Sequence, residues 1–170
     1  MNNTLLAFLV VVVCMISCRN AVTISTPAPP PDLIAYNNVP EDFWIFFQLF
    51  EREAYARGRS IDLREIGITA SIEEIHRTTG FVGLCSNQED PNHIMIDEGF
   101  WNQASSMKKE LIILHELGHC VLKRSHNDDA EGGVCKSIMR AGDTACIADY
   151  NKNTRAIYLD ELFSNIPIEK

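Results

Sequence analysis

The sequence has 170 residues, of which 46% are hydrophobic and 22% charged; this allows one globular domain with a real core and leaves little room for a second. The formal net charge is −8 at pH 7, and the sequence pI is about 5.1. This acidic balance argues against a nucleic-acid partner, because phosphate binding needs a surplus of Lys and Arg.

An unbroken apolar run occupies residues 5–16. The run is too short to span a bilayer and has the length of a signal-peptide apolar region, although no Lys or Arg precedes it. We therefore expect residues 1–17 to be a signal peptide that directs export across the inner membrane. A short N-terminal membrane anchor is the alternative.

The apolar run ends in Met15-Ile16-Ser17-Cys18, which resembles the lipobox of bacterial lipoproteins. In lipoproteins a small residue precedes a Cys that is lipidated and becomes the new N-terminus. The resemblance implies a mature protein that begins at Cys18 and is anchored to a membrane, in the periplasm or at the cell surface. Ordinary secretion with cleavage nearby is the alternative.

Four Cys would remain in the mature domain, an even number in a compartment that permits disulfides: Cys85, Cys120, Cys135 and Cys146. They allow three pairings, and the sequence does not choose between them. We favour Cys135 with Cys146, which closes a short loop, and Cys85 with Cys120. Four free thiols are the alternative; a Cys-based zinc site is disfavoured because no Cys-x-x-Cys spacing occurs.

Residues 18–39 are expected to be a tether, because the segment 26–31 is Pro-rich and favours extended backbone. A single domain is expected over residues 40–170. It opens with a predicted helix over 40–57, in which a stripe of Phe side chains falls on one face and is expected to be core.

Short strand-like runs follow this helix. Two of them, 68–77 and 81–85, flank a turn and predict a hairpin; the others are 92–97 and a weak run at 61–66. The remainder is predicted to be a strong helix over 103–122, capped by Ser105 or Ser106, a loop-rich segment over 127–150 and a closing helix over 153–165. This order of elements predicts an α+β fold.

The most informative motif is His115-Glu116-Leu117-Gly118-His119, inside the long predicted helix. Residues four apart share one helix face, so His115 and His119 can direct imidazole nitrogens at one point, which suits Zn²⁺. Glu116 borders the same point and can accept a proton from metal-bound water. The motif therefore predicts a zinc site that hydrolyses peptide bonds with Glu116 as the base.

A catalytic zinc site needs three protein ligands and one open position, and His126 is our choice for the third ligand. Here the segment resembles the metzincin clan of zinc peptidases, whose extended motif is H-E-x-x-H-x-x-G-x-x-H. His115, Glu116 and His119 match that motif, whereas His126 falls one position late and Leu122 stands in place of the Gly. The alternative third ligands are Asp128, Asp129 and Glu131.

Ser137-Ile138-Met139 resembles the methionine turn, which places a Met, here Met139, beneath the zinc of metzincins. The Tyr that often follows in that clan is missing, so Tyr150 and Tyr158 are the candidates for stabilising an oxyanion. The resemblance also implies that Ile94–Ile96 is an edge strand along the cleft that pairs with extended substrate.

Together with Tyr158–Phe163, these motifs make residues 81–163 similar to a group of small bacterial metallopeptidase lipoproteins. The resemblance implies a compact, single-domain, metzincin-like zincin of the α+β class, with a small twisted sheet, an active-site helix, a methionine turn and a C-terminal helix. It implies a monomeric, zinc-dependent endopeptidase that acts on protein or peptide substrates outside the cytoplasm.

A non-catalytic lipoprotein with a structural zinc site is the second hypothesis. Structural sites are normally closed by four protein ligands and do not need Glu116, so the presence of Glu116 favours catalysis. His76 and His93 lie on strand-like segments and are expected to be ordinary histidines.

Overall fold

The computed structural model describes residues 33–86, 92–142 and 147–164. The predicted signal peptide, Cys18, most of the predicted tether and Cys146 lie outside these residues. Within the described ranges, no helix combines the length and apolar character needed to cross a membrane.

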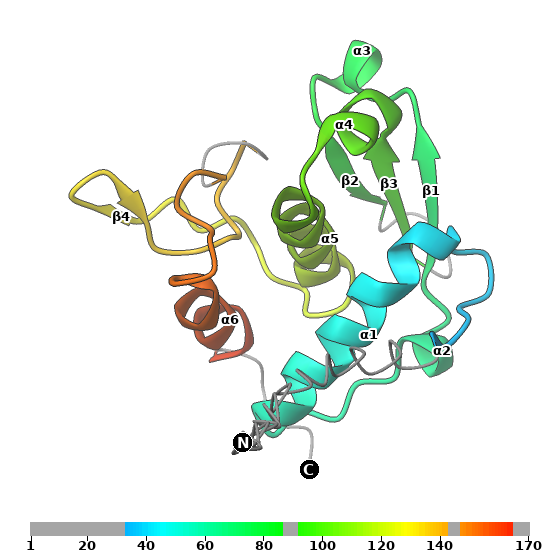
Figure 1. Cartoon of the computed structure of the whole chain (residues 1–170), viewed down its shortest axis with the longest axis horizontal. Helices are drawn as coiled ribbons and strands as arrows, with labels where there is room; N and C mark the ends of the chain where they lie inside the picture. Colours follow the sequence, from blue (N-terminus) through cyan, green and yellow to red (C-terminus); the bar gives the residue numbers. More distant parts are fainter. Residues whose placement is uncertain (1–32, 87–91, 143–146, 165–170) are drawn as a thin grey trace, which may run out of the picture. The chain divides into compact units, whose positions relative to one another are not determined.

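The core is built on helices α1 (Glu41–Ala56), α5 (Ser106–Cys120) and α6 (Arg155–Ser164) (Figure 1). Shorter helices connect the other elements: α2 (Leu63–Ile66), α3 (His76–Thr79) and α4 (Glu98–Gln103). Together with the strands described below, they make this chain an α+β protein, as predicted.

Helix α1 forms where the Phe stripe predicts it. Pro40 precedes its first turn, Glu41 and Asp42 occupy that turn, and Gly58 follows the helix with φ 76°. Phe43 and Phe47 are completely buried. Burying each such ring contributes about 1.5–3 kcal/mol, so this face holds α1 on the rest of the domain.

The main sheet contains β1 (Thr69–Glu73), β2 (Gly83–Ser86) and β3 (His93–Asp97) in the order β1-β3-β2. β3 is central, parallel to β1 and antiparallel to β2. The predicted hairpin between the segments 68–77 and 81–85 is therefore wrong, since β3 lies between the two strands.

The connection between β1 and β2 is a short helix and not a tight turn. The chain between β1 and β2 forms α3, whose His76 N–H donates to the Asp97 carboxylate at the end of β3. Gly80 ends α3 in the left-handed conformation, with φ 78°. The weak strand predicted at 61–66 is likewise α2, because Asp62 caps it by accepting from the N–H groups of Arg64 and Glu65.

Helix α5 runs through the centre of the core. The helix predicted over 103–122 is α5 over Ser106–Cys120; Gln103 instead ends α4, because Ala104 is extended, with ψ 139°. Residues 111–118 are all buried, as expected for a helix covered on every side. Contacts with α1, β2 and β3 cover part of its surface, and Leu162 of α6 lies against Gly118.

The predicted loop-rich segment contains one small addition. The strands β4 (Ala130–Glu131) and β5 (Val134–Cys135) form a tight hairpin through Gly132 and Gly133, both at positive φ. Two central residues with positive φ are typical of such a turn.

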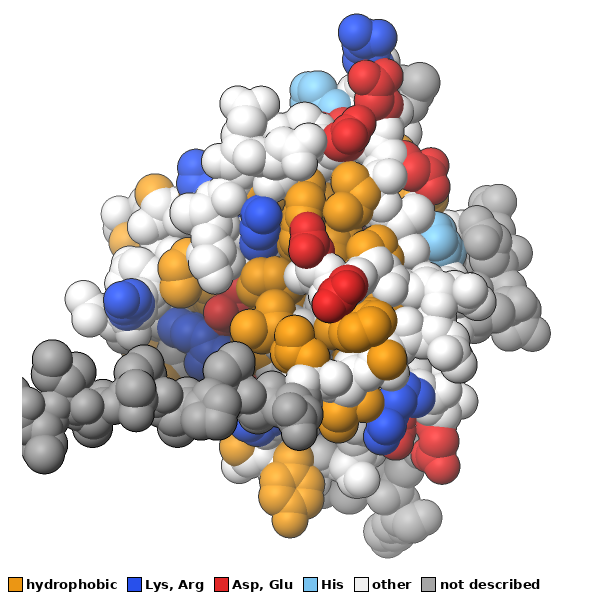
Figure 2. All heavy atoms as spheres, turned by 45° about the vertical axis from the view of Figure 1, so that its right-hand side comes forward, with side chains coloured by type: hydrophobic (Ala, Val, Ile, Leu, Met, Phe, Trp, Pro, Cys, Tyr) orange, Lys and Arg blue, Asp and Glu red, His pale blue; other side chains and the backbone are white. Residues whose placement is uncertain are grey.

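Some apolar side chains remain at the surface. Figure 2 shows hydrophobic side chains gathered in the middle of one face. The exposed large hydrophobic residues include Leu33, Ile34, Ile45, Tyr55 and Ile66. Apolar atoms make up much of any folded protein's surface, so exposure of this kind assigns no role by itself.

Candidate metal centre

Three histidines converge at the C-terminal half of α5. His115 and His119 lie one turn apart on the helix, and His126 reaches them from the loop that follows. The Nε2 atom of His119 lies 3.1 Å from that of His115 and 3.2 Å from that of His126. The structure therefore brings the predicted ligands together at one point.

Backbone carbonyls determine which nitrogen of the helical histidines faces this point. His115 Nδ1 donates to the Ile138 carbonyl at 2.6 Å, and His119 Nδ1 donates to the Arg124 carbonyl at 2.7 Å. A carbonyl oxygen only accepts, so each Nδ1 carries a proton, and each ring in its neutral form would direct the Nε2 lone pair at its neighbour. This is the arrangement of metal-ligating histidines, which usually donate from the other ring nitrogen.

The donor set fits a divalent cation that prefers imidazole. Neighbouring lone pairs on neutral rings repel unless a cation lies between them. Tetrahedral Zn²⁺ with bonds of about 2.0–2.1 Å holds its nitrogen ligands about 3.3 Å apart, close to the observed 3.1 Å and 3.2 Å. Imidazole also suits copper, nickel and iron, so the three histidines favour this group of transition metals together with zinc.

Lys123 provides the turn after the helix, one residue after Leu122, which stands at the position of the Gly in the metzincin pattern. It adopts φ 55°, and the N–H of Arg124 donates to the Gly118 carbonyl at 2.9 Å. Lys123 Nζ also donates to the Cys120 carbonyl, where a positive charge stabilises the end of a helix. The chain thus leaves α5 one residue later than in that pattern and still brings His126 to the site.

The alternative ligands lie elsewhere. Asp128 accepts from the N–H of Ala141, and Glu131 pairs with Lys136, which lowers the pKa of Glu131. His93 lies between the hydroxyls of Thr69 and Ser71. Within the described residues, the group that could hold a metal consists of the three histidines, so Asp128, Asp129, Glu131, His76 and His93 are not part of it.

Glu116 is buried beside His115 and lies against β2. A Cβ atom on Gly83 would be 2.5 Å from Glu116 Oε1 and 2.9 Å from Ile112 Cδ1. Only Gly therefore lets β2 pass over the carboxylate without a shift. The sequence analysis did not identify this residue; the signal was a Gly at the start of a strand, which often marks close approach.

The turn at residues 137–139 supports the helix from another side. Met139 is completely buried, and its Sδ atom would lie 2.4 Å from a Cβ atom on Gly118. Ser137 Oγ accepts from the N–H of Met139, and the intervening Ile138 carbonyl reaches His115. The segment that resembles a methionine turn thus contacts the histidine-bearing helix directly.

The two tyrosines proposed as oxyanion stabilisers have other partners. Tyr150 donates to the Glu110 carboxylate at 2.5 Å, and Tyr158 donates to the Cys135 carbonyl at 2.8 Å. Burial, with Glu110 as the second cause, raises the pKa of Tyr150. Neither tyrosine lines the cavity over the histidines.

A cavity of about 430 Å³ opens over the histidines. Its walls come from β2 and Phe81 just before it, from α5, from His126 on the loop after α5, and from the loop after Met139. The lining includes Phe81, Leu84, Glu116, Ala141 and Gly142. This volume lies in the range of small-molecule and peptide side-chain pockets.

A disulfide between Cys85 and Cys120 joins β2 to the end of α5, with a Cα–Cα distance of 5.6 Å. This predicted pairing is confirmed. Cys135 is also disulfide-bonded, and Cys146, its predicted partner, lies outside the described residues.

The expectation that Ile94–Ile96 forms the edge of the sheet is wrong. These residues belong to β3, the central strand, and both Ile side chains are completely buried. The edge strand beside the histidines is β2.

Comparison with family models, with curated proteins and with solved structures gives no match. The sequence motifs and the geometry of the site therefore carry the functional proposal.

Proposed function

We propose that the protein is a zinc-dependent endopeptidase in which His115, His119 and His126 hold the metal and Glu116 is the general base. The observation that carries this proposal is the convergence of the three Nε2 atoms beside a buried carboxylate on the same helix. Carbonyl acceptors on two of the rings prepare them as neutral ligands.

Zn²⁺ at this position would polarise the scissile carbonyl and lower the pKa of water toward neutrality. Glu116 is placed to accept the proton of the attacking water and to return it to the leaving amine. The close passage of Gly83 and the burial of Glu116 leave the carboxylate little room to move and limit competing water. The chain's own contribution is thus to orient three rings and one base around a single point.

The substrate is proposed to be an extended peptide lying along β2. β2 is one of the two edge strands of its sheet and lines the cavity, so a peptide laid along it would pass over the histidines. Phe81, which is 49% exposed, and Leu84 add apolar surface to this wall. An apolar side chain next to the cleaved bond is therefore the expected preference.

The protein is proposed to act outside the cytoplasm as a monomer, anchored through Cys18 in the periplasm or at the cell surface. The lipobox-like segment supports the anchor. The Cys85–Cys120 disulfide supports an oxidising compartment, because such bonds are rare in the cytosol.

The competing proposal, a structural zinc site, is less well supported. A structural site needs a fourth protein ligand. Among the described residues, no further His, Cys, Asp or Glu joins the three histidines. The cavity over them also leaves room for a substrate.

Metal content and hydrolysis of an unstructured protein substrate test the proposal in the purified protein. We expect about one zinc per chain in the wild type and in Glu116→Ala, and less in His126→Ala. Hydrolysis should be lost in both variants. His93→Ala is the matched control, because His93 lies on the sheet away from the cluster, and it should retain zinc and activity.

Two results would contradict the proposal. A folded wild-type protein that binds no zinc after reconstitution would exclude the metal site. A Glu116→Ala variant with wild-type hydrolysis would exclude the proposed base.

A further inference from the structure

One carboxylate on α6, that of Glu161, contacts both backbone segments that hold the helical histidines. Its Oε1 atom pairs with the guanidinium of Arg124 at 2.5 Å, and its Oε2 atom accepts from the Ser137 hydroxyl at 2.6 Å. No sequence motif with a chemical role includes this residue.

The partners of Glu161 lie next to the carbonyls that orient the rings. The carbonyl of Arg124 accepts from His119, and Ser137 immediately precedes Ile138, whose carbonyl accepts from His115. Glu161 therefore links the two acceptors through two short chains of contacts. It contacts neither histidine itself.

These contacts are partly shielded from water. The side chain of Arg124 is 11% exposed, and its Nη1 also donates to the Glu161 and Leu162 carbonyls at 2.8 Å. Ser137 is completely buried. The Glu161 side chain is 21% exposed, so solvent screens the ion pair in part, and the charge-assisted bonds still connect both backbone segments to α6.

We propose that Glu161 is a positioning residue that sets the orientation of His115 and His119 and thereby the affinity of the site for its metal. The proposal rests on the proposed function, because it takes these histidines to be metal ligands. If the Arg124 or Ile138 carbonyl shifts, the ring that donates to it rotates, and its Nε2 moves away from the common point. Groups that orient metal ligands typically change metal affinity 10–100-fold when removed.

Asp160 provides a matched control for the electrostatic and structural effects of changing α6. It precedes Glu161 and carries the same charge, but it pairs with Arg57, the residue after α1, at 2.8 Å, and its side chain is 72% exposed. Asp160→Asn therefore removes a charge and an ion pair from α6 without touching Arg124 or Ser137.

The experiment measures zinc affinity by competition with a chromophoric chelator and the visible spectrum of the Co²⁺-substituted protein. Glu161→Ala should weaken zinc binding about tenfold. This is the lower end of the effect of groups that contact the rings, because Glu161 contacts the neighbouring residues and not the rings themselves. The Co²⁺ bands should also change in position or intensity. Asp160→Asn should stay within about twofold of the wild type and keep its spectrum. Glu161→Gln serves as the variant of the same shape if Glu161→Ala does not fold, and it should be weaker than the wild type.

The outcomes separate this inference from the proposed function. If the wild type binds zinc and a folded Glu161 variant shows the same zinc affinity and the same Co²⁺ spectrum, the proposed function stands and the role proposed for Glu161 is overturned. Equal weakening in Asp160→Asn would also overturn it, because the effect would then be a general one of charge. A wild-type protein that binds no zinc would overturn the proposed function, and this inference with it.

Discussion

Gly83 is the residue at which the sheet comes closest to the proposed base. A Cβ atom there would lie 2.5 Å from Glu116 Oε1 and within 3.0 Å of two atoms of Ile112. Contacts this short cannot persist in a packed interior, so either the carboxylate or β2 must move.

Gly83→Ala is therefore expected to lower peptide hydrolysis at least about tenfold while zinc binding stays near the wild-type level, because a small misplacement of a reacting group has a large effect on rate. Steady-state hydrolysis and zinc titration check this. Ser86→Ala, at the other end of the same strand, is the control and should be unaffected. Full activity in Gly83→Ala would show that the base tolerates displacement.

Residue spacing predicted part of the site. His115, Glu116 and His119 follow from helical periodicity, which is a local property. The contribution of His126 depends on how the chain leaves α5, and no local rule places Lys123 at φ 55°. The role proposed for Gly83 depends on a contact between β2 and α5, and residue spacing along the sequence cannot predict a contact between two separate elements.

The disulfide between Cys85 and Cys120 ties the edge strand β2 to α5. It closes a loop with a sequence separation of 35 residues, and a loop of that length constrains the unfolded chain by about 2–4 kcal/mol. Since Cys85 also lines the cavity, the bond holds one wall of the site against the helix that carries the histidines.

Replacing both Cys85 and Cys120 by Ser should lower the free energy of unfolding by about 2–4 kcal/mol. Urea unfolding of the wild type and the double variant, each with and without reductant, measures the effect. Reductant should destabilise the wild type more than the double variant. An unchanged midpoint in the double variant would mean that packing alone holds β2 in place.

The types of most elements were predictable, but their pairing was not. The Phe stripe of α1 and the apolar run of α5 predict helices directly. The strand patterns at 68–77 and 81–85 suggested neighbours in a hairpin, whereas β3 separates them. The pairing joins segments far apart in the sequence, and Asp97 at the end of β3 also accepts from the N–H of His76 in α3.

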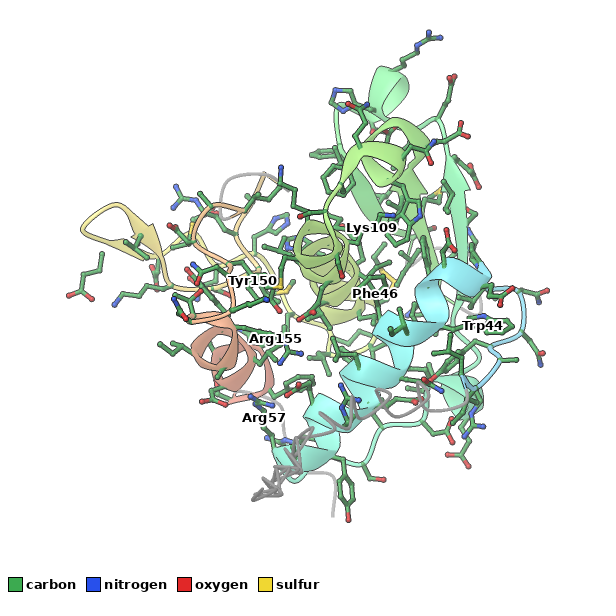
Figure 3. All side chains as sticks on the ribbon, viewed as in Figure 1. Trp44, Phe46, Arg57, Lys109, Tyr150 and Arg155 are labelled. Carbon is green, nitrogen blue, oxygen red and sulfur yellow. A yellow bond between two sulfur atoms is a disulfide. The ribbon has the colours of Figure 1, made fainter. Side chains whose placement is uncertain are left out.

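Charged side chains join the three long helices of the described chain. Arg155 of α6 pairs with Glu53 of α1 at 2.8 Å and with Glu110 of α5 at 2.5 Å, and Tyr150 donates to the same Glu110. Figure 3 shows Arg155 and Tyr150 beside α6, with Arg57 near the end of α1. The network fastens the helix that carries Glu161 to the helix that carries the histidines.

This network predicts a stability effect that depends on pH. Burial raises the pKa of Glu53, but the hydrogen bonds and charges of Arg57 and Arg155 outweigh burial, so the pKa lies below its ordinary value of 4.5. A carboxylate with a lowered pKa stabilises the folded state above its unfolded pKa and loses this contribution as pH falls through the folded pKa.

Glu53→Gln should therefore destabilise the protein at pH 7 by about 1 kcal/mol, a modest value because solvent screens the pair. The difference from the wild type should shrink as pH falls below 4.5. Thermal unfolding of both proteins between pH 3 and 7 tests this. A difference that is constant across the series would assign the loss to packing.

The three proposed ligands differ in how firmly the chain holds them. His115 and His119 belong to a buried helix, whereas His126 is exposed and lies on the loop that follows it. An ion held in this way would leave by releasing its loop ligand first while the helical pair still retains it. The rate of metal exchange would then follow the opening of one short loop, and the equilibrium preference among metals would follow the rigid pair on the helix.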